Sequence, residues 1–321
     1  MPEADPLDPF DSGAVNPTST MEPVDIAVPT ETRAARVGRA RRARLGIPGM
    51  MAIAWLAFVT LAALLAPILP LDDPNDNVAA IVKAPPGTDG HLLGGDGLGR
   101  DLLSRMVWGG RASLLLGVAS VLLGLLLGGL LGLVAGYFRG KTDTVLSGGF
   151  DTLLSFPQLI LALTLVTVFA SQEGTSETRR MVVLILALGV VSVPVLARIT
   201  RANTLVWTQR EFVQAARALG ARNRQIMFGE VLPNVLPAMF SIALLGVAVV
   251  IVAEGGLSLL GVGVQLPTPS WGNILSEGRS ELRDAPHIVL VPTVVIFLTV
   301  LALNYLGDVV RAHFDVRESA L

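Results

Sequence analysis

The sequence predicts an all-α polytopic membrane protein with six transmembrane helices. Of its 321 residues, 52% are hydrophobic and only 16% are charged, a balance too apolar for an ordinary soluble domain of this length. Uncharged runs long enough to cross a bilayer recur along the chain. The predicted spans are residues 46–71, 112–138, 152–172, 181–197, 231–253 and 285–307.

A polar segment, residues 1–45, precedes the first span. Residues 1–32 hold seven acidic side chains, six prolines and no lysine or arginine, a composition that favours disorder. Residues 33–44, RAARVGRARRAR, then hold six arginines. Basic residues beside a span are retained in the cytoplasm. We therefore expect a disordered cytoplasmic tail with a basic end, followed by the first span at 46–71.

The distribution of basic residues predicts the orientation of the whole chain. An even number of spans puts both termini on one side, and with that side inside, the inner segments hold 16 Lys and Arg against 8 outside. This predicts a core of residues 112–310 that contains a cytoplasmic loop at 204–235 and an extracytoplasmic loop at 257–287. An extracytoplasmic segment at 72–111 precedes the core, and a cytoplasmic tail at 311–321 follows it.

Two spans carry packing signals. The second repeats small residues every four positions, at Ser120, Gly124, Gly128, Gly132 and Gly136, which predicts a close helix contact along that face. The fourth has only 17 uncharged residues. We expect it to continue through Arg198, with that side chain reaching the interface.

The stretch LSLLGVGVQLPTPSW, residues 257–271, is uncharged but is broken by glycines and prolines. Irregular backbone at membrane depth is tolerated where it is buried in protein or lines a wet cavity. Pro267 and Trp271 are therefore candidate gate residues. Glu254 interrupts the preceding apolar run, and its position allows either a structural hydrogen bond or a contact to a pathway.

The most polar part of the second half of the chain, EFVQAARALGARNRQIMFGEVLPN at 211–234, predicts a cytoplasmic helical hairpin. Thr208 and Glu211 match a capping box, and Gly220 stands where a helix can end in a left-handed turn. Asn223 can cap a second short helix, which would stop at Leu232-Pro233.

One face of the first hairpin helix is apolar or small. Because a short helical pair is marginal in water, this face needs a cover. The cover is either the chain's own bundle or another protein. The face is formed by Phe212, Ala215, Ala216 and Leu219.

This hairpin resembles the coupling loop of permease subunits of prokaryotic ATP-binding-cassette (ABC) importers. Their pattern is Glu-Ala-Ala, three residues, Gly, nine residues, then Ile-x-Leu-Pro; Gln214 here replaces the Glu, and Glu230 replaces the Ile. The resemblance implies a type I permease fold and contacts to an ATPase. The implied coupling residues are Gln214, Ala215, Ala216, Gly220, Leu232 and Pro233, with Glu211 and Arg217 as polar contacts.

Three other stretches narrow the resemblance to the second permease of dipeptide, oligopeptide and nickel importers. They are HLLGGDGLGRDLLSRMVWGGRASL, DTLLSFPQLIL and VQLPTPSWGNILSEGR. Such a subunit lies in the plasma membrane, in contact with lipid. The implied partners are a homologous permease in a heterodimer, two ATPases that bind ATP and Mg²⁺, an extracytoplasmic binding protein and a peptide substrate.

Several functions are excluded or disfavoured by composition. The net charge of −2 argues against nucleic acid, and the absence of cysteine excludes thiolate sites. The three histidines show no ligand spacing, so no metal site, cofactor or catalytic residue is predicted in this chain. GYFRGKT lacks the spacing of a phosphate-binding loop. The alternatives left open are an ion-driven secondary transporter or channel, and a membrane scaffold.

Overall fold

The computed structural model describes residues 46–170 and 176–318, so the predicted tail at 1–45 lies outside the described residues. The long helices are α2 (Ile47–Leu65), α3 (Leu102–Phe138), α6 (Glu177–Trp207), α9 (Leu232–Leu259) and α11 (His287–Glu318). The shorter helices are α4 (Gly140–Leu154), α5 (Gln158–Ala170), α7 (Glu211–Ala218), α8 (Asn223–Gln225) and α10 (Trp271–Gly278). The remaining turns are 3₁₀ turns η1 (Ala79–Ile81) and η3 (Arg279–Glu281) and the π-helical turn η2 (Ile226–Val231).

The predicted all-α membrane fold is confirmed. Within the described residues, five helices are long and apolar enough to cross a membrane, and α4 with α5 makes a sixth crossing if the pair counts as one span. The uncharged run predicted as a span at 152–172 is not one continuous helix, because α4 and α5 meet within it at an angle of 84°. Pro157 lies in the break, where it has no N–H to donate and disfavours helix at the residue before it.

Two spans are longer than their uncharged runs because arginines inside them have acidic partners. In α3 the guanidinium of Arg105 is fully buried and contacts Glu277 at 3.0 Å. In α6 the helix continues past Arg198, as predicted, and the half-exposed side chain of Arg198 pairs with Asp151 of α4. A charge that would end a span when unpaired is tolerated beside a partner.

Helices α3 and α6 pack through the predicted small-residue face. A Cβ atom added at Gly128 would lie 2.5 Å from the carbonyl oxygen of Val193, and one at Gly132 would lie 2.2 Å from that of Ala197. Only glycine permits backbones to approach this closely. The predicted close contact is confirmed, and it fixes α3 and α6 along most of their length.

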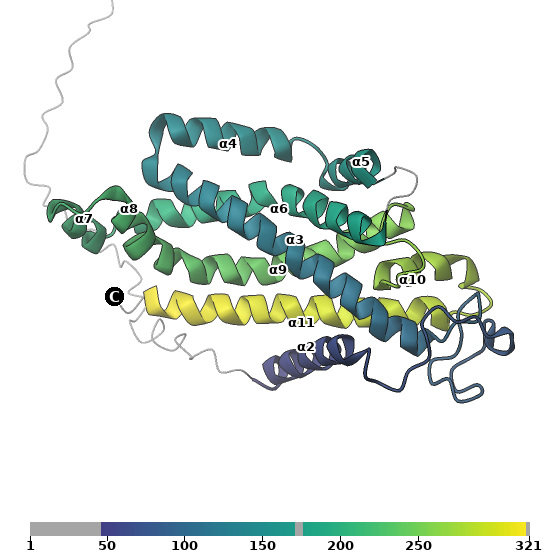
Figure 1. Ribbon diagram of the computed structural model, residues 1–321. Coiled ribbons are helices and arrows are strands. Elements are labelled where there is room, and N and C mark those ends of the chain that lie inside the picture. The colour runs from purple at the N-terminus through teal and green to yellow at the C-terminus, as the bar shows by residue number, and fades with distance from the viewer. Residues whose placement is uncertain (1–45, 171–175, 319–321) are drawn as a thin grey trace, which may run out of the picture. The chain divides into compact units, whose positions relative to one another are not determined.

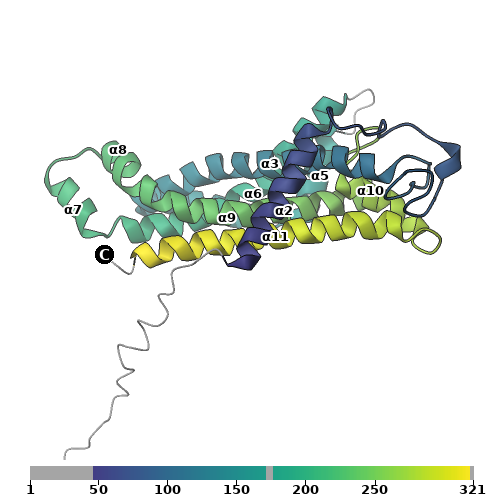
Figure 2. The ribbon, with the colours of Figure 1, turned by 90° about the horizontal axis from the view of Figure 1, so that it is seen from below.

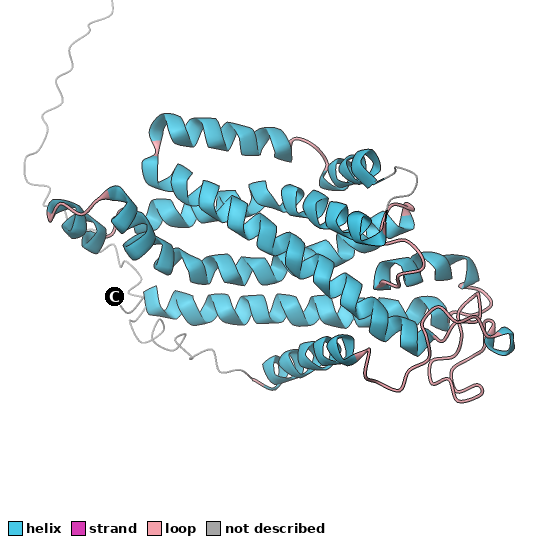
Figure 3. Ribbon diagram, viewed as in Figure 1, coloured by secondary structure: helices cyan, strands magenta, loops and turns pink. Residues whose placement is uncertain are grey.

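The elements that connect the long helices gather at two opposite ends of the bundle. Figure 1 shows α7 and α8 at one end, and α10 with the loop between α2 and α3 at the other. Figure 2 shows the same separation after a 90° turn. Most of the irregular backbone lies at the α10 end (Figure 3). We call residues 208–231 the hairpin, and residues 72–105 with 254–287 the α10 region.

Candidate coupling hairpin and gate

The start of the hairpin differs from the predicted capping box. Helix α6 extends to Trp207, so Thr208 occupies its C-cap, where the hydroxyl donates to the carbonyl oxygen of Leu205 at 3.0 Å. Helix α7 follows Arg210 without a side-chain cap, and Glu211 is its exposed first residue. The Thr208 capping box is therefore wrong, because α7 begins at Glu211 and its N-cap position is Arg210, while Thr208 belongs to the turn that ends α6.

The second predicted cap is also wrong. The N-cap residue of α8 is Arg222, whose backbone N–H donates to the side-chain oxygen of Gln225 at 3.0 Å. Asn223 is the first residue of the helix, and its side-chain oxygen accepts the hydroxyl proton of Tyr137 at 3.1 Å. Asn223 thus fastens the hairpin to the end of α3 and does not cap its own helix.

The glycine turn of the hairpin is confirmed. Gly220 has a φ of 82°, in the left-handed region that favours glycine. The N–H of Ala221 donates to the carbonyl oxygen of Ala216, and the N–H of Gly220 donates to that of Arg217, each at 3.1 Å. This pair of bonds is the Schellman motif, which ends α7 and reverses the chain.

The apolar face of α7 is largely uncovered by the chain itself. Within α7 the buried side chain is Val213, whereas Phe212 is 39% exposed and Leu219, next to the turn, is 88% exposed. Ala215 is exposed and Ala216 is half-buried against the core. The chain's own bundle therefore covers this apolar face only around Val213. The rest of the face remains available to another protein.

The predicted end of the hairpin at Leu232-Pro233 is wrong. These residues open α9, which continues from η2 without a break. Proline is tolerated in the first turn of a helix, where its missing N–H has no partner to lose. The widened turn η2 lies directly before it, and π turns of this kind are frequent at functional sites.

The hairpin is attached to α3 by two polar contacts. Besides the bond between Tyr137 and Asn223, Nη2 of Arg139 donates to Oγ1 of Thr208 at 3.1 Å. Arg139 links α3 to α4 with a φ of 54°, which is unfavourable for a residue with a side chain. A hollow of about 600 Å³ lies beside it, and Gln214 and Arg217 line its hairpin side.

At the opposite end, Glu254 is buried and hydrogen-bonded. Its Oε1 accepts from the hydroxyls of Ser258 at 2.8 Å and Ser270 at 2.9 Å, and 1% of the residue is exposed. Its Oε2 lies against Gly272, where a Cβ atom would be 2.6 Å away. In this conformation the carboxyl makes structural hydrogen bonds between α9 and the start of α10.

Trp271 anchors α10 to α3. Its backbone N–H donates to Oγ of Ser113 at 3.1 Å, its indole N–H donates to the carbonyl oxygen of Met106 at 3.0 Å, and 1% of the residue is exposed. Pro267 lies on the exposed part of the loop before α10. That loop contacts the start of α6 through Gln265 with Arg180 and through Thr268 with Glu177. The three predicted gate residues therefore share one structural unit.

A buried cluster of ion pairs in the α10 region was not predicted from the sequence. Arg100 contacts Asp96 at 2.6 Å and Glu277 at 2.7 Å, and Arg105 contacts the same Glu277 oxygen at 3.0 Å. The cluster joins the two stretches GGDGLGRDLLSR and LSEGR. Both stretches belong to the sequence patterns that resemble one importer subfamily, and this was the signal that the sequence offered. Sequence spacing does not show that charged side chains more than 170 residues apart form ion pairs.

Comparison with known proteins decides the family. The model of the family described as "Binding-protein-dependent transport system inner membrane component" matches residues 128–319. The chain belongs to this family. A glutathione transport system permease protein GsiD from Pectobacterium atrosepticum is 39% identical over 225 residues, covering 70% of this permease and 72% of the relative. One from Escherichia coli is 38% identical with the same coverage.

The fold of this permease is also found in a solved ABC transporter. A chain of the MetNI methionine ABC transporter, in an inward-facing conformation, matches with a TM-score of 0.56 and 21% identity. The match covers 66% of the permease and 97% of that chain. The protein is thus a multi-pass membrane subunit of an ABC importer, a transport component and not an enzyme. As in ABC systems generally, ATPase and binding-protein partners complete it.

Proposed function

We propose that this permease forms half of an import pathway for short peptides and transmits ATP-driven motion to that pathway through its hairpin. The observation that carries the proposal is the exposed apolar end of α7 beside the Schellman turn at Gly220. A leucine 88% exposed next to a rigid turn is suited to enter a cleft of another protein. That protein is one of two cytosolic ATPases, which hold ATP and Mg²⁺; the permease itself needs no cofactor.

The proposed orientation puts the hairpin and both termini in the cytoplasm and the α10 region outside. The excess of Lys and Arg on the hairpin side supports it. In this orientation Glu211, Gln214 and Arg217 are exposed beside Leu219, as polar contacts at the rim of an ATPase interface would be. The α10 region then faces the extracytoplasmic binding protein that delivers the cargo.

We propose that the loop at 260–270 is the moving part of the outer gate. It is held to α6 by exposed contacts, Gln265 with Arg180 and Thr268 with Glu177, whose loss exposes no buried charge. Glu254 and Trp271 fix the two ends of the loop through buried hydrogen bonds. Opening would therefore move Pro267 while these ends stay in place.

The proposed cargo class rests on the relatives. Both named relatives are glutathione transport permeases, and glutathione is a tripeptide, so short peptides are the substrate class we propose. A homologous second permease would supply the other half of the pathway as a heterodimer. The choice between dipeptide, longer peptide and metal complex would belong to the binding protein.

The test is affinity purification of the tagged permease from its native membrane in mild detergent, followed by uptake assays in vesicles. We expect a second six-span permease and ABC ATPases to co-purify, and the reconstituted complex to accumulate labelled peptide only with ATP and binding protein. Purification of the chain alone, with solute uptake driven by an ion gradient, would favour the secondary transporter and overturn the proposal.

A further inference from the structure

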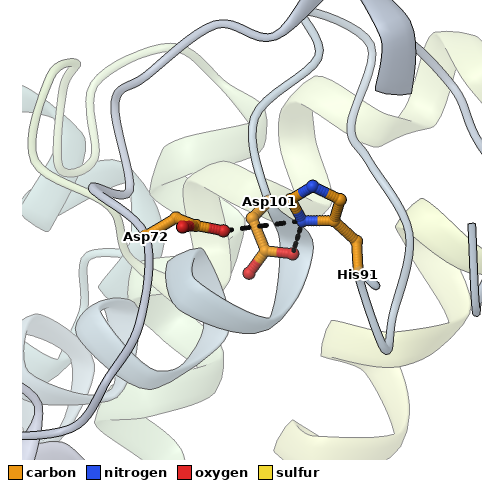
Figure 4. Close-up of side chains that lie close together, drawn as sticks. All are labelled: Asp72, His91 and Asp101. Carbon is orange, nitrogen blue, oxygen red and sulfur yellow. Dashed lines mark hydrogen bonds and ion pairs between the residues drawn. The ribbon is translucent and has the colours of Figure 1, made fainter. Parts of the chain in front are cut away.

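Three side chains of the α10 region converge on one point. Figure 4 shows the carboxylates of Asp72 and Asp101 directed at the same ring nitrogen of His91. Nδ1 of His91 lies 2.9 Å from Oδ1 of Asp101 and 3.6 Å from Oδ2 of Asp72. The three candidate ligand atoms all lie within 4.8 Å of one another. None of these residues takes part in the coupling hairpin or the gate loop.

A single proton on Nδ1 of His91 cannot serve both carboxylates. Nδ1 carries at most one proton, and Asp101 is within hydrogen-bond distance, so Asp72 at 3.6 Å is left beyond it. Two carboxylates against one imidazole leave a net charge of −1 when the ring is protonated and −2 when it is neutral. A divalent cation at the point of convergence would neutralise both carboxylates and use the nitrogen lone pair.

The distances from Nδ1 of His91 to the two carboxylate oxygens fit a tetrahedral metal site. Zinc binds imidazole nitrogen and carboxylate oxygen at about 2.0–2.2 Å, so two ligand atoms on a tetrahedron are about 3.3–3.5 Å apart. The observed 2.9 and 3.6 Å lie on either side of that value. The two carboxylate oxygens lie within 4.8 Å of each other and would approach the same value in a metal site. The side chain of Asp72 is 68% exposed, which gives it room to move and leaves the fourth position to water.

Each ligand is held by the surrounding backbone. Asp101 is the N-cap of α3, and its Oδ2 accepts from the N–H of Ser104 at 2.7 Å. The hydroxyl of Ser104 in turn donates to the carbonyl oxygen of Asp72 at 2.5 Å. His91 sits in a turn in which its N–H donates to the carbonyl oxygen of Thr88 at 2.9 Å. Such supporting bonds orient metal ligands.

We propose that His91, Asp72 and Asp101 form a binding site for a divalent transition metal of the zinc type. One imidazole with two carboxylates favours such an ion over Ca²⁺ or Mg²⁺, which prefer oxygen ligands alone. The ion would tie the segment after α2 to the start of α3. This site depends neither on the cargo nor on the orientation proposed above.

The test is titration of the purified full chain, carrying a tag without histidine and freed of metal by chelation, with Co²⁺. A tetrahedral Co²⁺ site absorbs visible light, and Zn²⁺ should displace it. We expect one ion per chain. Both His91→Ala and Asp72→Asn should weaken binding by at least about tenfold. Asp72→Asn keeps the bond between His91 and Asp101, so it remains informative if His91→Ala fails to fold.

The matched control is His287→Ala, which removes another histidine of the α10 region, in contact with the carbonyl oxygen of Gly95 at 3.3 Å. It should leave Co²⁺ binding unchanged. Absence of binding by the unmodified chain, or binding that survives both His91→Ala and Asp72→Asn, would overturn the site and leave His91 and Asp101 as a hydrogen-bonded pair.

Discussion

The hairpin and the α10 region, at opposite ends of one bundle, are stabilised in different ways. Within α7 the hairpin buries Val213 and leaves Leu219 exposed beside the turn. The α10 region buries a carboxyl at Glu254, an indole at Trp271 and a guanidinium at Arg105. Buried polar groups depend on hydrogen bonds and ion pairs made within the chain, whereas an exposed apolar end requires a partner from outside.

Because of this difference, we expect variants at the two ends of the bundle to affect different properties of the permease. Changes in the α10 region should lower the stability of the permease itself, because they leave buried charges or hydroxyls without partners. Changes at the turn and the exposed positions of the hairpin should affect stability less and should mainly weaken the ATPase contact.

Glu277→Ala should have the largest effect, because one carboxylate serves both Arg100 and the fully buried Arg105. Removing one partner of a buried pair typically costs about 3–5 kcal/mol, and we expect about 3 kcal/mol since Glu277 is partly exposed. Thermal unfolding in detergent would measure it. The control is Glu281→Ala, because its partner Lys83 lies on the surface. An equal loss of stability in Glu281→Ala would show that the buried cluster contributes no more than a surface ion pair.

Glu254→Ala should lower stability by about 1–3 kcal/mol, because the hydroxyls of Ser258 and Ser270 would lose their acceptor. Glu254→Gln keeps an oxygen at that position and should retain most of the stability and uptake. Thermal unfolding and vesicle uptake would be measured on both variants. Normal stability with abolished uptake in Glu254→Gln would instead identify a pathway contact.

Gly220→Val should strain the turn by about 1–2 kcal/mol, since a β-branched residue disfavours positive φ. Nothing lies within 4 Å of its Cβ position, so the bundle should remain folded while ATPase co-purification falls several-fold. Gly148→Val is the matched control, at a helical glycine with equally open surroundings. Unchanged co-purification in Gly220→Val would count against the hairpin as the docking element.

Tyr137→Phe should have the smallest effect, about 1 kcal/mol, by removing the hydrogen bond to Asn223. Because this bond ties the hairpin to α3, ATPase binding should persist while peptide transported per ATP hydrolysed decreases. Simultaneous measurement of uptake and hydrolysis would detect the change. An unaltered ratio would show that the contact does not transmit motion.

Periodicity and residue type were sufficient to predict the five long helices, the close packing of a small-residue face on α3 and the turn at Gly220. They failed where a side chain has a partner distant in sequence. Arg105 fell outside the predicted span at 112–138 because its partner Glu277, 172 residues away, could not be assigned to it. The pairing of Arg198 with Asp151 was missed for the same reason. Thr208 and Asn223 fit local capping rules, yet one ends the preceding helix and the other binds Tyr137.

The candidate metal site shows the same limitation. His91, Asp72 and Asp101 are separated by 10 to 29 residues of irregular chain, so no spacing rule groups them. They come together because η1 and the turns around it fold the segment back onto the start of α3. Contacts of this kind follow from the tertiary structure of a loop.

The most direct measurement uses the absence of cysteine from the chain. Leu219→Cys would introduce a single thiol at the tip of the hairpin, and a membrane-impermeant maleimide would report which side it faces. We predict labelling only in inside-out vesicles, and protection from labelling when the ATPases are bound. Leu92→Cys, at an exposed position of the α10 region, should label only from the outside. Labelling of Leu219→Cys from outside, or unchanged labelling with ATPases present, would contradict the coupling role.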